Sequence, residues 1–195
     1  MMIKKEAWHQ GLRLLEPIGS ERAWPLLFLV LWNVNVFAAE PAAIQLTSPA
    51  FQSGSEIPQE YTCEGRDVSP PLVWKEIPKE SQSLVLIMDD PDVPAGTWVH
   101  WVIFNLPPTI HSLPKGMPAL KQLANGEMHG MNSFGRYGYR GPCPPSGSHR
   151  YFFKLYALDI PLQEQERMTK EEVEKAAEGH VLAQGELMGT YAKKK

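Results

Sequence analysis

The sequence lacks the features that would point to a nucleic-acid-binding protein, a serine hydrolase or a protein built from repeats. Lysine and arginine number 19 against 22 aspartates and glutamates, so the net charge of −3 gives no electrostatic basis for binding nucleic acid. No Gly-x-Ser-x-Gly motif marks a nucleophilic serine, and no internal repeat is present. Only two cysteines occur, and neither lies in a Cys-x-x-Cys or another metal-ligand spacing. The remaining composition, 43% hydrophobic and 21% charged, suits one globular domain with a core.

The first 38 residues have the order of an export signal. Four basic residues precede the apolar run Trp24–Leu31, and Val36-Phe37-Ala38 is a plausible cleavage site. The run is short for a bilayer span, and two asparagines interrupt its continuation. We expect residues 1–38 to be a cleaved signal peptide and residues 39–195 to form a periplasmic or secreted domain. This domain has 15 basic and 19 acidic residues, a net charge of −4. A retained membrane anchor or a misassigned start codon would be the alternatives.

Two apolar segments of strand length, Leu84–Met88 and Trp98–Leu106, flank a short acidic loop. The loop carries three aspartates and two prolines, whose fixed φ angles make it stiff. His100 lies on the second segment, and strict alternation places it on the side of Trp98, Val102 and Phe104. A histidine near fixed carboxylates could form the wall of a polar pocket. Alternatively, the loop is an acidic turn and His100 is a core histidine bonded to a backbone carbonyl.

A second loop, rich in glycine and proline, leads directly into the apolar strand Arg150–Leu158. Alternation places one polar pair and two apolar residues on a single face of this segment: His149, Tyr151, Phe153 and Leu155. Both strong strands therefore carry a histidine at the end where a proline-stiffened loop arrives.

The rest of the chain predicts more strands and one helix. Thr169-x-x-Glu172 is a capping box, and Gly179 ends the helical pattern that follows it. Short strands are expected at Ile44–Thr47 and Val181–Tyr191. With strands and tight turns predominating, the pattern predicts an all-β fold, an antiparallel β-sandwich with a peripheral helix near the C-terminus.

Residues 109–135 form a long irregular segment between the two strong strands. Segments of this length inside a compact domain are usually functional or mobile. Its two histidines, His111 and His129, have no patterned partners, and we expect both at the surface.

Four motifs follow one another in a specific order and spacing. They are Tyr61-Thr62-Cys63-Glu64-Gly65 with Ser69-Pro70-Pro71-Leu72-x-Trp74, Asp90-Pro91-Asp92-x-Pro94 with His100-Trp101, Gly141-Pro142-Cys143-Pro144-Pro145-x-Gly147-x-His149-Arg150-Tyr151, and Gly189-Thr190-Tyr191. Over residues 44–191 the set resembles the phosphatidylethanolamine-binding protein family, which includes the Raf kinase inhibitor protein, and is most similar to its bacterial branch.

The resemblance implies a Greek-key β-sandwich and a small pocket that binds phosphate-like and other small anions, in a non-enzymatic, Raf kinase inhibitor-like binding protein. Carried over by position, the ligand-binding residues would be Asp90, Asp92, His100, Pro145, His149 and Tyr151. The expected partner is a small anionic or phosphorylated ligand, and a protein partner stays open. No cofactor, nucleic acid or stable membrane span after signal cleavage is expected.

The chemistry of these residue types suits an anion. Protonated imidazoles, a tyrosine hydroxyl and backbone N–H groups all donate hydrogen bonds to phosphate oxygens. A fixed carboxylate can bond one imidazole nitrogen and aim the other at the ligand.

Two other functions stay open. Two histidines and an aspartate could hold a divalent metal and hydrolyse a phosphoester, although no candidate ligands have a helical metal-binding spacing. The protein could instead be an interaction module or an inhibitor that acts through surface loops such as residues 109–135.

Cys63 and Cys143 both lie in the predicted mature domain, each in a loop next to a pocket motif. An oxidising compartment would allow them to form one disulfide, whereas two buried free thiols are the alternative.

Overall fold

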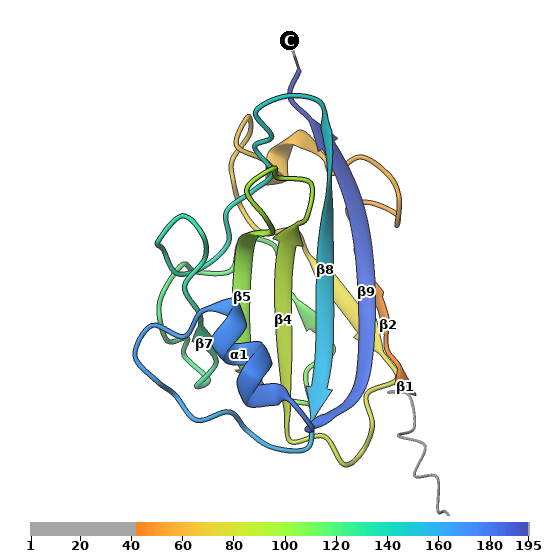
Figure 1. Ribbon diagram of the computed structural model, residues 1–195. Helices are drawn as coiled ribbons and strands as arrows, with labels where there is room; N and C mark the ends of the chain where they lie inside the picture. The colour runs from red at the N-terminus through yellow and green to blue at the C-terminus, as the bar shows by residue number, and fades with distance from the viewer. Residues whose placement is uncertain (1–41, 195) are drawn as a thin grey trace, which may run out of the picture. The chain divides into compact units, whose positions relative to one another are not determined.

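Strands are the main regular element of the computed structural model, which describes residues 42–194 (Figure 1). The elements in this part are β1 (Ala42–Ala43), β2 (Gln45–Thr47), a 3₁₀ turn (Gln59–Tyr61), β3 (Leu72–Lys75), β4 (Ser83–Asp90), β5 (Trp98–Leu106), β6 (Ser112–Leu113), β7 (Met128–His129), β8 (Ser148–Leu158), α1 (Lys170–Ala177) and β9 (Val181–Ala192). The predicted signal peptide, residues 1–38, lies outside the described residues.

The strands form two sheets. The larger sheet has the order β1-β9-β8-β4-β5-β7, and the smaller has the order β2-β3-β6. The strand-dominated fold with a peripheral helix is confirmed. The prediction of purely antiparallel pairing was wrong at one edge, where the two-residue strand β1 runs parallel to β9. The chain leaves this edge at once and enters the smaller sheet as β2, so the parallel contact stays short. The Greek-key connectivity implied by the resemblance stays a prediction.

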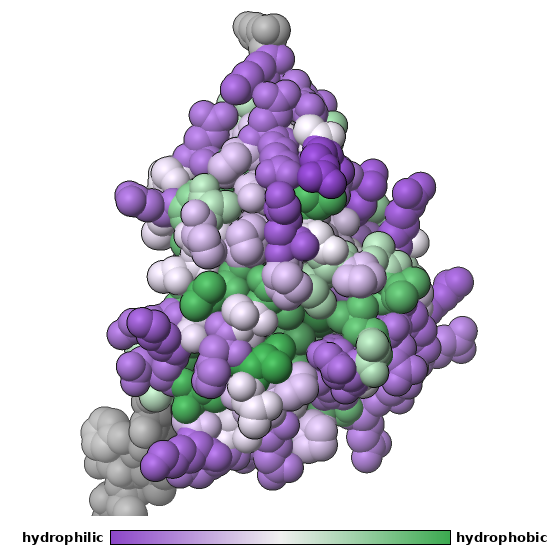
Figure 2. All heavy atoms as spheres, turned by 180° about the vertical axis from the view of Figure 1, so that it is seen from behind, coloured by the Kyte–Doolittle hydropathy of each residue, from purple (hydrophilic) through white to green (hydrophobic). Residues whose placement is uncertain are grey.

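The main core lies between the two sheets. It contains fully buried side chains from both of them, including Leu72 and Trp74 of β3 and Leu86, Trp101 and Phe153 of the larger sheet. The outward face of the smaller sheet is seen from behind in Figure 2, where a band of apolar residues lies among hydrophilic ones. The partly buried residues packed against this core are Ala50, Val68, Ile77, Ile110 and Met117.

Helix α1 covers the opposite face of the larger sheet (Figure 1). Val173 and Ala177 of the helix pack with Val85 and Ile87 of β4 in a second buried cluster. The predicted capping box is confirmed: Glu172 N donates to the Thr169 side chain, and Thr169 N donates to the Glu172 carboxylate. No helix in residues 42–194 is both long and apolar enough to cross a membrane.

Residues 109–135 are less irregular than expected, because they contribute β6 and β7 to the two sheets. His111 is exposed, as predicted, but the surface prediction for His129 was wrong: this residue is 1% exposed. Its Nδ1 donates to the carbonyl of Leu120 at 2.7 Å, and its ring lies 6.2 Å from that of Trp101. Burial lowers the pKa of His129. No local sequence pattern indicates these two contacts, because both depend on where the irregular segment folds.

Candidate ligand-binding site

The two motif loops meet because their strands are neighbours in the larger sheet. Strand β4 pairs with β5 on one side and with β8 on the other. Figure 1 shows the β4–β5 loop and the start of β8 at the same end of this sheet. Asp89 and Asp90 were predicted in the loop, but both lie in β4, where they pair with Val99 and Trp98. The carboxylate of Asp90 is therefore held by a strand and not by a loop.

A β-bulge determines where His100 lies. Met88 pairs with Trp101 and Asp89 pairs with Val99, so His100 is the extra residue on β5. The prediction that His100 shares a side with Val102 and Phe104 was wrong for this reason. Those two residues pack in the cluster beneath α1, whereas the His100 ring lies 5.2 Å from that of Tyr151, a residue of the inter-sheet core.

A pocket of about 250 Å³ lies between these strand ends. It is lined by Asp90, Val93, Trp98, His100, Phe134, Cys143, Pro144, Pro145 and Tyr151. Four of the six predicted ligand-binding residues, Asp90, His100, Pro145 and Tyr151, thus line the same pocket. His149 and Asp92 are not among the lining residues, although each contacts a neighbouring part of the site.

His149 lies behind the pocket carboxylate. Its Nδ1 donates to Oδ2 of Asp90 at 2.7 Å, and the two residues are 8% and 2% exposed. The other oxygen, Oδ1 of Asp90, accepts from the backbone N–H of Asp92 at 2.8 Å. The Asp90 carboxylate therefore joins the start of β8 to the β4–β5 loop as well as lining the pocket.

Asp92 joins the β4–β5 loop to Arg150 of β8, and it does not line the pocket. Its two carboxylate oxygens accept from Nη2 and Nε of Arg150 at 2.6 and 3.0 Å, and the Arg150 backbone N–H donates to it at 2.8 Å. These hydrogen bonds lower the pKa of Asp92 to about 2. The fork-like pairing positions the loop, and it leaves Asp92 with its acceptors already occupied.

His100 combines both of the roles considered from the sequence. Its Nδ1 donates to the backbone carbonyl of Arg140 at 2.7 Å, as expected for a core histidine. The same side chain lines the pocket. Because Nδ1 carries the proton, Nε2 of the neutral ring is an acceptor, and it becomes a donor when the ring is protonated. Burial lowers the pKa of His100, partly offset by the Arg140 carbonyl and the charge of Asp90.

Tyr151 has the one hydroxyl group among the residues that line the pocket. The residue is fully buried, and no group among residues 42–194 hydrogen-bonds its Oη. The Asp90 carboxylate and the Cys143 backbone lie near it but outside hydrogen-bonding geometry, and burial raises its pKa, with a smaller contribution from the charge of Asp90. Buried polar groups are usually paired, so an unpaired hydroxyl at this position is unusual.

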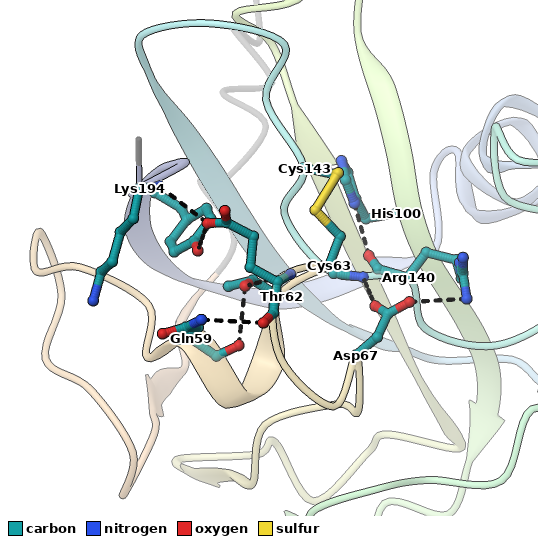
Figure 3. The surroundings of a disulfide bond; sticks show 11 residues. Gln59, Thr62, Cys63, Asp67, His100, Arg140, Cys143 and Lys194 are labelled. Atoms are coloured by element: carbon teal, nitrogen blue, oxygen red, sulfur yellow. Dashed lines mark hydrogen bonds and ion pairs between the residues drawn. A yellow bond between two sulfur atoms is a disulfide. The ribbon is translucent and has the colours of Figure 1, made fainter.

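The Cys63–Cys143 disulfide is confirmed, with the two Cα atoms 5.4 Å apart. It joins the Thr62–Glu64 segment to the pocket wall, as Figure 3 shows together with the Arg140–Asp67 and His100–Arg140 contacts. Three of the four residues in 142–145 are prolines and have no backbone N–H to donate. The disulfide is therefore a main anchor of this wall.

Trp98 and Phe134 line the pocket although neither was predicted as a site residue. Trp98 begins β5 directly beside the acidic loop, so its position next to Asp90 was a usable signal. Phe134 comes from the irregular segment, and nothing in the local pattern indicated that it reaches the pocket. Among residues 42–194, no group of three or more His, Cys, Asp or Glu side chains that could hold a metal ion is found.

Comparison with known proteins gives consistent similarities. The family model described as phosphatidylethanolamine-binding protein matches residues 47–192. A UPF0098 protein of Methanothermobacter thermautotrophicus is 50% identical over 148 residues, which are 76% of this chain and 98% of the relative. A UPF0098 protein of Chlamydia muridarum is 48% identical over 153 residues, 76% of this chain and 98% of the relative.

Two crystal structures are also similar. One is of a putative phosphatidylethanolamine-binding protein homologue, CT736, from Chlamydia trachomatis, with a TM-score of 0.72 and 46% identity over 78% of this chain and 99% of the other. The second is of E. coli YbcL, described as a new member of the mammalian PEBP family, with a TM-score of 0.72 and 30% identity over 78% of this chain and all of the other. This chain belongs to the phosphatidylethanolamine-binding protein family.

Proposed function

We propose that this chain is a non-enzymatic binding protein whose pocket takes a small phosphate-bearing or other small anionic ligand. The observation that carries the proposal is the pocket where Asp90, His100 and Tyr151 meet, and where the buried Tyr151 hydroxyl has no hydrogen-bond partner among residues 42–194. An anionic oxygen would accept from this hydroxyl and, once His100 is protonated, from its Nε2. The family's Greek-key β-sandwich is part of the same proposal.

The charged groups that line the pocket determine which anions can bind. Asp90 is the lining carboxylate, and no lysine or arginine side chain lines the wall. A bound anion is therefore stabilised when His100 is protonated. In the free protein burial lowers the pKa of His100, so the ring is protonated less readily there. Binding should take up a proton, and affinity should weaken as pH rises. A ligand that also carries an amine or hydroxyl could donate to Asp90, which favours phosphomonoesters with such a group close to the phosphate.

The proline-rich walls suit a preformed site. Pro144 and Pro145 line the pocket, and Pro91 and Pro94 fix the neighbouring loop that the Arg150–Asp92 pair holds. Little ordering of the chain is needed on binding, so less affinity is lost to conformational entropy.

Replacement of Tyr151 by Phe tests the proposal. This change removes a hydroxyl for which no hydrogen bond is found within residues 42–194, so stability should change little while affinity for phosphomonoesters falls about tenfold. Tyr139→Phe is the matched control, because its buried hydroxyl donates to the Tyr61 carbonyl at 2.6 Å and it does not line the pocket. That variant should lose stability and keep affinity.

Calorimetric titration with inorganic phosphate and a panel of phosphomonoesters, at pH 5.5 and 7.5, gives both readouts. Repeating each titration in buffers of different ionisation enthalpy measures the proton uptake. Equal affinities for wild type and Tyr151→Phe would contradict the proposed site, and absence of binding by every anion would contradict the ligand class.

We also infer export from the cytoplasm to a periplasmic or extracellular location. The Cys63–Cys143 disulfide supports this inference, because structural disulfides persist mainly in oxidising compartments.

A further inference from the structure

The pocket has a second chemical character in addition to its polar groups. Trp98 and Phe134 line it together with Val93 and two prolines, so aromatic and apolar side chains are present as well as the polar Asp90, His100 and Tyr151. Phe134 is 38% exposed, one of two large hydrophobic residues exposed in the described part of the chain. The other is Leu120, which does not line the pocket.

Phe134 is held in place by its neighbours and is not a loose surface side chain. Its ring meets Trp98 edge-on at 5.5 Å and His100 at 5.4 Å. The Arg140 guanidinium lies 5.9 Å from the ring centre. Edge-to-face contacts of this kind fix the orientation of an aromatic ring.

The loop below Phe134 is fixed as well. The side chain of Asn132 accepts from the backbone N–H groups of Phe134 and Arg136 at 3.0 and 3.1 Å. Ser133 is joined to Val99 of β5 by two hydrogen bonds of 2.9 Å, one from its backbone N–H and one to its hydroxyl. The ring is thus presented to the pocket in a set position before any ligand arrives.

We infer that the ligand carries a planar aromatic group, joined by one short linkage to its anionic group, and that Phe134 determines this specificity together with Trp98. The anionic group of this ligand rests on the proposed function, whereas the aromatic group is inferred from Phe134 and Trp98. The pocket volume of about 250 Å³ admits one ring and one phosphate-sized group, and it is smaller than the sites of drug-sized ligands. Covering roughly 60 Å² of the ligand ring is worth about tenfold in affinity.

A matched set of probes tests the inference on the purified protein. Phenyl phosphate and methyl phosphate share the anionic group and differ in the ring, and benzyl alcohol carries the ring without the charge. Wild type should bind phenyl phosphate about tenfold more tightly than methyl phosphate. Phe134→Ala should reduce this preference to about twofold or less, whereas Phe134→Trp and Leu120→Ala should retain it.

Two results would overturn the inference: equal affinities of wild type for the two phosphates, or an undiminished preference in Phe134→Ala. If neither phosphate binds, the proposed function fails and benzyl alcohol decides the aromatic specificity separately. A saturable shift of the Trp98 indole N–H resonance by benzyl alcohol, lost in Phe134→Ala, would then uphold the aromatic site, and no shift would overturn it.

Discussion

The Nδ1 atom of His149 lies 2.7 Å from Oδ2 of Asp90, although the two residues are 59 positions apart in the sequence. Both are buried, and the same carboxylate accepts from the Asp92 backbone. This pair therefore joins the two loops that carry the site and fixes the orientation of the pocket carboxylate.

Replacing His149 by Ala should destabilise the protein. The change leaves the buried Asp90 carboxylate without its imidazole partner, which should cost about 3 kcal/mol of unfolding free energy. The exposed Arg150–Asp92 pair offers the matched control, since Arg150→Ala should cost about 1 kcal/mol or less. Urea denaturation at pH 7 measures both. A cost for His149→Ala no larger than that for Arg150→Ala would contradict a structural role for the pair.

The disulfide should contribute strongly to stability. Cys63 and Cys143 are 80 residues apart, and closing a loop of that size is worth roughly 3–5 kcal/mol in the chain-entropy model. Denaturation of the oxidised protein and of the double variant Cys63→Ala with Cys143→Ala measures the difference. Thiol labelling of the denatured, non-reduced protein should find no free cysteine. Detection of two free thiols would refute the disulfide in the native protein.

Stability should fall as pH is lowered below about 6.5, the ordinary pKa of histidine. Burial lowers the pKa values of His100 and His129 in the folded state, so the unfolded chain binds these protons more readily. The stability that these two neutral histidines contribute is therefore fully present above pH 6.5. It is lost as the pH falls from 6.5 to their lower folded-state pKa values.

Each of these histidines should contribute up to about 1.4 kcal/mol per pH unit within the window. Urea denaturation from pH 7.5 to pH 5 measures the slope. His129→Gln should reduce it, while His111→Gln, a change at an exposed site, should leave it unchanged. Equal slopes in wild type and His129→Gln would contradict the assignment for His129.

The mature protein should begin after residue 38. The basic residues, the apolar run and Val36-Phe37-Ala38 have the order of a cleaved export signal. N-terminal sequencing of the protein from its native cell measures the start directly. A mature chain beginning at Met1 would show that the segment is retained.

Local patterns were sufficient for the elements whose signals are local. The capping box at Thr169 and the apolar strand Trp98–Leu106 appear in the structure at the positions that the sequence predicts. The terminal strand predicted at Val181–Tyr191 is confirmed: β9 is 12 residues long, from Val181 to Ala192, and pairs with β8 along nearly its whole length. Its two glycines weaken the strand pattern, yet Gly185 and Gly189 are needed because a Cβ atom there would meet Ile44 and Ile57 at 2.2–2.5 Å.

The sequence by itself determined the family and indicated four residues that line the pocket, Asp90, His100, Pro145 and Tyr151, because motif order and residue chemistry are written along the chain. Only the tertiary structure decided how those residues act. His100 reaches the pocket through a bulge that alternation does not predict, and Asp92 is engaged by Arg150. Phe134 enters from a loop with no periodic pattern. Side-chain direction at a bulge, and contacts between loops distant in sequence, depend on strand register and long-range packing, which no local pattern encodes.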